Sequence, residues 1–312
     1  GDHRDLHLSL RRQRQMCIRD RIDVVRKYVN ERLIPLESKI SEEDKIPEEV
    51  VQEMRDLGLF GLTIPQEYGG IGLNTEQECR VVMELGRTSP AFRSIFGTNN
   101  GIGSQGIVMD GTNEQKSYYL PKLASGEIIG SFALTEPEAG SDAGSLQTKA
   151  TLEGDEYVLN GTKRYITNAP NAQLFTVFAR TDPSTNNSRG VSAFLVDSKL
   201  PGISLGQPYK KMGQQGAHVC DVVFDNCRVP AAQILGGPEK INQGFKSAMK
   251  TLDRGRIHIS ALSVGCANRL IDLCLSYSVE RKQFGKQIAE FQLLQGMIAD
   301  SKTESYACLL YT

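Results

Sequence analysis

The sequence predicts an α+β protein with an N-terminal α-helical domain, a central antiparallel β domain and an incomplete C-terminal α-helical bundle. Over residues 22–128, apolar side chains recur three to four positions apart, which is the spacing of one helix face. Over 129–237, short apolar runs alternate with turn residues, which is typical of strands. Helical spacing then returns over 238–307.

The composition excludes several classes of protein. A chain of 312 residues has room for two or three domains, and 39% hydrophobic residues support a buried core. A net charge of −1 predicts no nucleic-acid partner. No uninterrupted run of about 18 apolar residues occurs, so we expect no membrane span. The seven cysteines and four histidines are scattered, so we expect reduced thiols and no metal site.

Both ends of the chain have an unusual composition. Residues 1–21 and 308–312 look like translated sequencing adapters, and we expect them to be artefactual extensions. A transit peptide is the alternative for the first segment, because it contains six arginines. Asp2, Asp5 and Asp20 count against it, since transit peptides contain few acidic residues. We therefore base no functional argument on either segment.

Helix starts in the first domain are predicted from capping signals. Pro47 is placed as the first-turn residue of a helix. The pattern Thr75-x-x-Glu78 is typical of a capping box. Residues 111–116 cap a further helix, which we expect to end near Pro121.

The β domain is predicted from its turns. Gly154-Asp155 and Asn160-Gly161 are both hairpin-turn dipeptides, and residues 182–189 form a polar surface loop.

The last part is predicted to hold two helices. The first begins near Phe245 and continues through Tyr277, and the second starts around Ile288. Their apolar faces would need more helices in a complete bundle.

The string from Phe132 to Asp142 carries the first chemical signal. An apolar, strand-like run ends at the hydroxyl of Thr135, and a turn of small residues leads to Ser141. Small residues such as Gly140 let backbone N–H groups approach a phosphate or a flavin edge. The string resembles Thr-Glu-Pro-x-Ala-Gly-Ser-Asp, the flavin-binding turn of the acyl-CoA dehydrogenase family. The alternative is a plain glycine turn between two strands.

A second string, Tyr165-Ile166-Thr167-Asn168, also resembles this family. The family usually has a tryptophan at the first position, stacked on the flavin. This chain has no tryptophan, and Tyr165 takes that place. The resemblance implies that Thr167 binds the flavin edge near N5. Taken alone, the string would be read as an ordinary strand.

A third string starts at Arg281 and includes Gln283, Phe284 and Gln292. The resemblance implies that it reaches the FAD bound mainly by a neighbouring subunit, and so implies a homo-oligomer, a dimer or a tetramer. An arginine fork can hold a pyrophosphate in a geometry that lysine cannot reproduce. A solvated charge at a helix end is the alternative.

The fourth string surrounds Gly255. The resemblance implies that Asp253 and Arg256 lie beside the CoA and the catalytic carboxylate. One branch of the family has its base, a glutamate, at the position of Gly255, which has no side chain. The catalytic base is therefore unknown here, and we expect a glutamate beyond Thr312.

Two further patterns are set aside. Residues 101–106 match G-x-G-x-x-G, but they follow a helical region, and a dinucleotide fingerprint needs a preceding strand. Arg93 is placed like an arginine that binds a distal substrate carboxylate in part of the family. The glutamate expected seven residues earlier is Gly86, so a surface arginine is the default interpretation.

Together the resemblances imply an FAD-dependent α,β-dehydrogenation of an acyl-CoA thioester to the trans-2-enoyl-CoA, with electrons passed to an electron-transfer flavoprotein. The alternatives are an acyl-CoA oxidase or flavin monooxygenase that uses oxygen, and an inactive fragment without its base. The expected location is the cytoplasm of a bacterium or the mitochondrial matrix of a eukaryote. The expected cofactor contacts are Phe132, Leu134, Thr135, Gly140, Ser141, Tyr165, Ile166, Thr167, Arg281, Gln283, Phe284 and Gln292. The expected substrate contacts are Ser141, Asp253 and Arg256.

Overall fold

The computed structural model describes residues 18–311. The chain divides into two compact units, of which one comprises Gly1–Glu37, Asn74–Pro90 and Arg256–Thr312, and the other Ser38–Leu73 and Ala91–Gly255. Most of the N-terminal segment read as an adapter lies outside the described residues. Residues 308–311 form the last turn of a helix.

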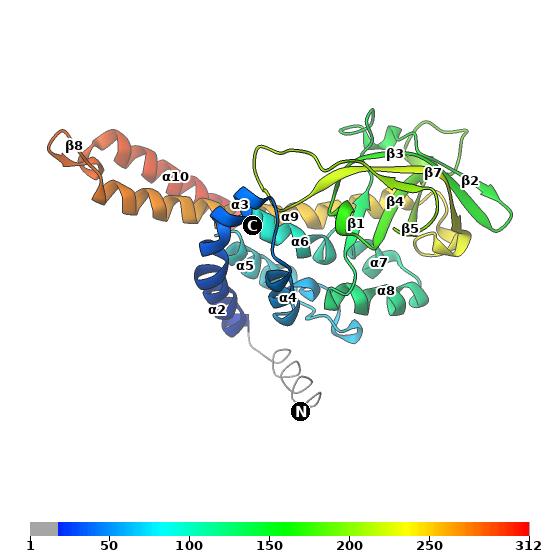
Figure 1. The fold of residues 1–312 in the computed structure, drawn as a ribbon, viewed down its shortest axis with the longest axis horizontal. Coiled ribbons are helices and arrows are strands. Elements are labelled where there is room, and N and C mark those ends of the chain that lie inside the picture. The colour runs from blue at the N-terminus through cyan, green and yellow to red at the C-terminus, as the bar shows by residue number, and fades with distance from the viewer. Residues whose placement is uncertain (1–17, 312) are drawn as a thin grey trace, which may run out of the picture. The chain divides into compact units, whose positions relative to one another are not determined.

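The first unit is helical. Figure 1 shows α10 running back along the C-terminal half of α9, with a two-stranded hairpin between them. The elements of this unit, including the parts of α3, α6 and α9 that fall in it, are α2 (Ile18–Tyr28), α3 (Glu37–Glu43), α5 (Thr75–Leu85), α6 (Pro90–Asn100), α9 (Gly244–Glu280), β8 (Lys282–Gln283), β9 (Lys286–Gln287) and α10 (Gln292–Tyr311).

Two glycines let α5 and α9 pack closely in this unit. A Cβ atom on Gly265 would lie 2.0 Å from the carbonyl oxygen of Met83, and one on Gly86 would lie 2.2 Å from that of Leu262. Such distances exclude any larger residue without movement of the backbone. The apolar cluster at this crossing consists of Cys79, Val82, Ala261 and Leu262.

By length and composition, α9 is the one helix within residues 18–311 that would be able to cross a membrane, a test that long core helices also pass. Two charges interrupt its apolar stretch, and both have partners on other segments. The Arg269 guanidinium donates to both carboxylate oxygens of Glu37, at 2.5 and 2.8 Å, and Asp272 accepts from Arg87 at 2.8 Å.

The second unit contains a seven-stranded sheet with the order β1-β4-β2-β3-β7-β6, and β5 pairs with β4. Its strands are β1 (Gly130–Ala133), β2 (Lys149–Glu153), β3 (Glu156–Thr167), β4 (Leu174–Arg180), β5 (Val191–Asp197), β6 (Ile203–Leu205) and β7 (Val219–Pro230). The α+β class is confirmed. The sheet is mixed, because β1 runs parallel to β4, whereas β3 and β7 pair antiparallel along most of their length.

The core of this unit lies on both faces of β4, whose residues are all buried. Phe175 and Val177 belong to one apolar cluster, formed mainly by strands of the sheet, while Leu174 and Phe178 belong to another. This alternation follows from the two-residue period of a strand. The second cluster includes residues of α7 (Gln105–Asp110) and α8 (Asn113–Ser125), which cover that face (Figure 1). The unit also contains α4 (Glu48–Asp56), and Pro47 is its N-cap residue, one position before the first turn in which it was predicted.

One of the two predicted hairpin turns is correct. Gly154 and Asp155 join β2 to β3, but Asn160-Gly161 lies inside β3, so that prediction was wrong. Gly161 has φ +154°, and the pairing with β7 shifts register between Leu159 and Gly161. The dipeptide therefore marks a β-bulge, not a turn.

Three helix boundaries also differ from the prediction. The capping box of α5 is Asn74 with Gln77, one position before the predicted pair. The helix α8 is capped by Thr112 as predicted but continues through Pro121 to Ser125, because the fully buried Leu120 and Leu123 hold the turns on either side of the proline. The last helix starts at Gln292, after a 3-10 turn over Ile288–Glu290.

Candidate functional site

The predicted flavin turn follows β1 in the second unit. Glu136 and Ala139 exchange backbone hydrogen bonds of 3.1 and 3.3 Å, which closes a tight turn. Thr135 is half-buried, and its carbonyl oxygen accepts from the N–H of Arg164 at 2.8 Å. Beyond the turn, Gly140 and Ser141 are exposed. The turn thus presents a backbone segment and a hydroxyl at the surface.

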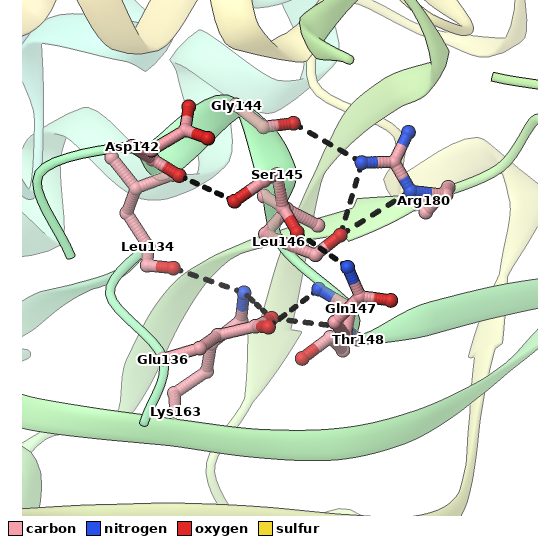
Figure 2. A network of polar contacts seen from close by, with 10 residues as sticks. All are labelled: Leu134, Glu136, Asp142, Gly144, Ser145, Leu146, Gln147, Thr148, Lys163 and Arg180. Carbon is pink, nitrogen blue, oxygen red and sulfur yellow. Dashed lines mark hydrogen bonds and ion pairs between the residues drawn. The ribbon is translucent and has the colours of Figure 1, made fainter. Parts of the chain in front are cut away.

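A buried ion pair holds this turn in place. Lys163 on β3 is fully buried, and its ammonium donates to Glu136 Oε1 at 2.7 Å and to the carbonyl oxygen of Leu134 at 3.1 Å. The Glu136 carboxylate also accepts the N–H groups of Gln147 and Thr148, at 2.5 and 2.9 Å (Figure 2). Thr135 therefore lies between two residues that are held by the same ammonium.

Burial and charge act in opposite directions on this pair. Burial lowers the pKa of Lys163 to about 8, although the Glu136 carboxylate opposes the shift. Burial alone would raise the pKa of Glu136, but the Lys163 ammonium and the hydrogen bonds from Thr148 and Gln147 outweigh it and keep that pKa below its ordinary value. Each partner therefore favours the charged form of the other.

Arg180, at the end of β4, braces the segment that follows the turn. Its guanidinium donates to the carbonyl oxygens of Gly144 at 3.1 Å and Leu146 at 3.0 Å (Figure 2). It also donates to those of Thr185 at 2.8 Å and Asn187 at 3.0 Å in the polar loop that the sequence predicted. One cation thus ties two surface segments together through four backbone carbonyls.

The second predicted string sits on a β-bulge. Between Lys163 and Ile166 the pairing of β3 with β7 shifts register, and Tyr165 has φ +59°. A bulky residue in the left-handed region is unusual, and such conformations cluster at functional sites. As a result the Tyr165 ring is 59% exposed on a strand whose next residue, Ile166, is buried.

The structure brings these two strings together. The Ser131 hydroxyl on β1 donates to the carbonyl oxygen of Thr167 at 2.6 Å, and the carbonyl oxygen of Thr135 accepts from the backbone N–H of Arg164 at 2.8 Å. Among the other predicted cofactor residues, Leu134 is buried, and the Phe132 ring packs 4.7 Å from that of Phe178.

Asn168 anchors the end of the second string. It has φ +62° and is buried, and its amide nitrogen donates to Ser94 O at 2.7 Å and Thr98 Oγ1 at 3.1 Å. The sequence pattern included Asn168 but gave it no role. These hydrogen bonds tie the residue that follows β3 to α6, a helix that is distant in the sequence.

The remaining predicted cofactor residues belong to the helical unit. Arg281 follows α9, Gln283 lies in β8, and Gln292 opens α10. Phe284 has φ +54°, is 92% exposed, and lies 6.2 Å from the ring of Phe291. These residues gather around one hairpin, and their contact with a cofactor stays a prediction.

The fourth string lies on α9. Asp253 and Gly255 fall in the sheet-containing unit and Arg256 in the helical unit. A Cβ atom on Gly255 would meet only Ile102 Cγ2, at 3.8 Å. Neighbouring atoms therefore do not require a glycine here, and a longer side chain has room at its base.

The two patterns that were set aside also have clear places. Residues 101–106 follow α6, so no strand precedes them and the rejection of a dinucleotide fingerprint is confirmed. Arg93 lies against its own helix, because a Cβ atom on Gly97 would come within 2.5 Å of its Nε. Across the described part of the chain, no group of three or more His, Cys, Asp or Glu side chains is placed to hold a metal ion.

Three family models match the chain in sequence order. They are the acyl-CoA dehydrogenase N-terminal domain over residues 18–127, the middle domain over 131–227 and the C-terminal domain over 242–312. The chain belongs to the acyl-CoA dehydrogenase family. The mixed sheet and the helical regions on either side of it in the sequence are the fold of its structural neighbours.

Several relatives are similar over nearly the whole chain. A probable acyl-CoA dehydrogenase of Bacillus subtilis is 39% identical over 96% of this chain and 77% of its own length. An acryloyl-CoA reductase (NADH) of Anaerotignum propionicum is 41% identical over 97% of this chain and 75% of its own length. A mitochondrial isovaleryl-CoA dehydrogenase of Pongo abelii is 38% identical over 92% of this chain and 68% of its own length.

Several solved structures have a similar fold. Butyryl-CoA dehydrogenase from Megasphaera elsdenii has a TM-score of 0.87 at 33% identity, covering 93% of this chain and 76% of that one. A structure described as an electron transferring flavoprotein of Acidaminococcus fermentans has a TM-score of 0.88 at 37% identity, covering 93% of this chain and 75% of that one. An acyl-CoA dehydrogenase from Bacillus anthracis complexed with FAD has a TM-score of 0.85 at 33% identity, covering 93% of this chain and 49% of that one.

The cofactor of this family member is FAD, and the turn at Gly140 fits such a group. A Cβ atom on Gly140 would meet no atom within 4 Å, and its φ lies outside the left-handed region. Neither packing within the protein nor backbone conformation therefore requires glycine at this position. A large ligand that lies against the backbone does explain it.

Buried cations are what the sequence analysis missed. Lys163 and Arg180 carry no motif, because their role depends on strands that are distant in the sequence. The one local signal for Lys163 is its position in the sequence. It lies two residues before Tyr165, in a strand about half of whose other residues are apolar.

Proposed function

We propose that this protein dehydrogenates an acyl-CoA thioester at its α and β carbons to give the trans-2-enoyl-CoA. The observation that carries the proposal is the turn of Thr135 to Ser141, braced by Lys163 and Arg180 and joined to the exposed ring of Tyr165. FAD, when bound, supplies the two-electron acceptor for hydride from the β carbon.

The residues of the turn have separate roles in this proposal. The hydroxyls of Thr135 and Thr167 bind the flavin edge, and the Tyr165 ring covers one of its faces. Ser141 serves both cofactor and substrate, since it is exposed just beyond the turn. The apolar Phe132, Leu134 and Ile166 hold the backbone that carries these groups.

The remaining predicted residues act on the CoA and on a second FAD. Asp253 and Arg256 bind the CoA portion. Arg281, Gln283, Phe284 and Gln292 contact FAD of a neighbouring subunit, so that the active form is a homo-oligomer. Removing the α proton requires a carboxylate, and the thioester carbonyl requires hydrogen-bond donors to stabilise the developing enolate.

The electron acceptor in this proposal is an electron-transfer flavoprotein. Its support is the structural likeness to the Acidaminococcus fermentans chain, whose description names such a protein. The relatives include bacterial enzymes and mitochondrial ones, so the proposed location is the bacterial cytoplasm or the mitochondrial matrix.

A second candidate is the reverse reaction, reduction of an enoyl-CoA. It is favoured by the relative described as an acryloyl-CoA reductase, which is 41% identical. The two directions share the same flavin turn. Anaerobic mixing of the FAD-loaded protein with acyl-CoA and, separately, of the reduced protein with enoyl-CoA distinguishes which direction is faster.

The test of the proposed reaction is a gain of function at Gly255. The chain as given should bleach its flavin slowly with acyl-CoA, because Gly255 cannot remove a proton. Gly255→Glu introduces a carboxylate at a position whose Cβ meets no close neighbour, and should raise the anaerobic bleaching rate by about two to four orders of magnitude. Gly255→Gln is the matched control and should not accelerate it.

The outcomes separate the reaction from the identity of its base. Fast bleaching of the unmodified chain with acyl-CoA would support the reaction and show that a base already lies within the chain. FAD-loaded Gly255→Glu protein that binds acyl-CoA but shows no faster bleaching would argue against this reaction. Rapid reoxidation in air would point instead to an oxidase, for which the structural likeness to a prolyl acyl carrier protein oxidase gives a precedent.

A further inference from the structure

The exposed ring of Tyr165 does not stand alone. Two side chains of the sheet-containing unit lie against it, Arg164 on the same bulge and Tyr209 in the segment before β7, and Asp221 on β7 contacts both of them. Tyr209 is half-buried, whereas the four residues before it and the one after it are exposed. Tyr209 is therefore the least exposed residue of this stretch.

The two rings are in direct contact. The centroids of Tyr165 and Tyr209 are 5.1 Å apart with 49° between the ring planes, within the range of favourable aromatic pairs. The backbone N–H of Tyr209 donates to Val219 O at 2.9 Å, so the segment is pinned to β7 at this residue.

Asp221 links the cluster. One carboxylate oxygen accepts the Tyr209 hydroxyl at 2.9 Å, and the other lies 3.5 Å from the Arg164 guanidinium. That guanidinium is itself 6.0 Å from the Tyr165 ring centroid. The carboxylate therefore holds both groups that flank the exposed ring, one by a hydrogen bond and one by a weaker ion pair.

The geometry points to Tyr209, anchored by Asp221, as a positioning residue that holds the Tyr165 ring in place as the aromatic wall of the flavin site. The inference rests on the proposed function, since it takes Tyr165 as the residue that covers the flavin. An unsupported ring on an exposed bulge would occupy several rotamers, and FAD binding would have to order it. A ring that is already held loses less freedom when the ligand binds.

The anchor matters more for a tyrosine than it would for a larger ring. The chain contains no tryptophan, so the phenol ring of Tyr165 must provide the stacking surface. The Tyr209 ring packs against it at an angle of 49°, and the Arg164 guanidinium lies 6.0 Å from its centroid. Arg164, Tyr209 and Asp221 thus hold the Tyr165 ring in a position that the backbone of the bulge does not fix by itself.

The test is a double-mutant cycle on the full chain, with FAD affinity measured by quenching of flavin fluorescence and the bound flavin followed by visible circular dichroism. Tyr209→Ala should weaken FAD binding by about three- to tenfold and change the flavin dichroism. Tyr209→Phe and Asp221→Asn, which keep the ring but lose the strong hydrogen bond, should show a smaller change. Tyr118→Ala removes an exposed tyrosine of α8 and should change neither readout.

The cycle separates positioning from a general structural effect. If Tyr209 acts through Tyr165, Tyr209→Ala should have no further effect once Tyr165 is alanine. An equal loss of affinity in both backgrounds, or no loss in either, would overturn the inference while leaving the proposed function standing. If Tyr165→Ala leaves the flavin dichroism unaltered, Tyr165 does not contact the flavin. If the unmodified protein binds no FAD, both the role of Tyr209 and the proposed function are overturned.

Discussion

Lys163 holds the flavin turn through one ammonium, and its removal should be costly. Lys163→Met leaves the Glu136 carboxylate buried without its cation, which typically costs about 3–5 kcal/mol of unfolding free energy. The double variant Lys163→Met with Glu136→Gln should regain part of that loss, because no charge remains buried. Urea unfolding of the single and double variants measures both effects.

A solvent-exposed pair provides the control for this experiment. Arg228 and Glu153 form an ion pair of 2.7 Å with about half of each side chain exposed, so Arg228→Met should change stability little. Similar losses for the buried and the exposed pair would show that burial of the Glu136 charge does not matter.

The same carboxylate predicts a pH dependence. The pKa of Glu136 lies below its ordinary value of 4.5 in the folded protein, chiefly because Lys163 offsets the effect of burial. Below about pH 4.5 the unfolded chain binds a proton there more readily than the folded one, so the stabilisation is present above this pH and is lost as the pH falls. The destabilisation caused by Glu136→Gln should therefore be smaller at pH 4 than at pH 7. A loss that is independent of pH would contradict the lowered pKa.

At this scale the sequence predicted candidate ligand contacts but not the buried groups that hold them. Thr135 and Tyr165 were proposed from their strings, and the structure brings those strings together through the backbone of Arg164. Lys163 and Arg180 were not found, because a buried cation is recognised only when its partners are known. Those partners come from strands and turns that are distant in the sequence.

Among the elements, the crossing of α5 and α9 depends on glycine. Gly265→Ala would gain helix propensity but place its Cβ 2.0 Å from the Met83 carbonyl oxygen, so we expect a net loss of about 1–3 kcal/mol. Gly296→Ala in α10 is the matched control, because a Cβ there meets nothing within 4 Å, and it should stabilise by about 0.5–1 kcal/mol. Equal gains for both variants in thermal unfolding would show that the helices move apart freely.

Element boundaries were predictable only where local signals decide them. The Gly154 turn and the Thr112 cap were predicted correctly, since each depends on a few adjacent residues. The bulge at Gly161 has the same local signal as a turn, and only its pairing with β7 distinguishes the two. Pro121 remains helical because buried leucines flank it, which a propensity argument does not take into account.

In the whole molecule, the helical unit presents an apolar surface that bears on assembly. The inner sides of α9 and α10 line a groove of about 830 Å³, and apolar side chains on both helices, such as Leu273 and Leu293, are exposed. Single exposed apolar residues are ordinary, but an apolar groove of this size is typical of a surface that packs against another segment. Two occupants fit it: the further helices that a complete bundle would need, or a neighbouring subunit.

The proposed role of Arg281 would connect assembly with cofactor binding. It belongs to the helical unit, whereas the turn at Thr135 belongs to the other. If Arg281 contacts the FAD of a neighbouring subunit, FAD affinity must increase with protein concentration as subunits associate. Arg281→Lys keeps the charge but loses the forked geometry, and should weaken FAD binding about three- to tenfold at high protein concentration only.

The measurement is an FAD titration by fluorescence quenching at two protein concentrations, one on each side of the association midpoint found by sedimentation. Lys302→Ala, which removes an exposed charge from α10, should leave both titrations unchanged. A loss of affinity in Arg281→Lys that is the same at both concentrations would place the contact within one chain. Unchanged FAD affinity at both would remove Arg281 from the site, and the case for a shared active site would then depend on the apolar groove alone.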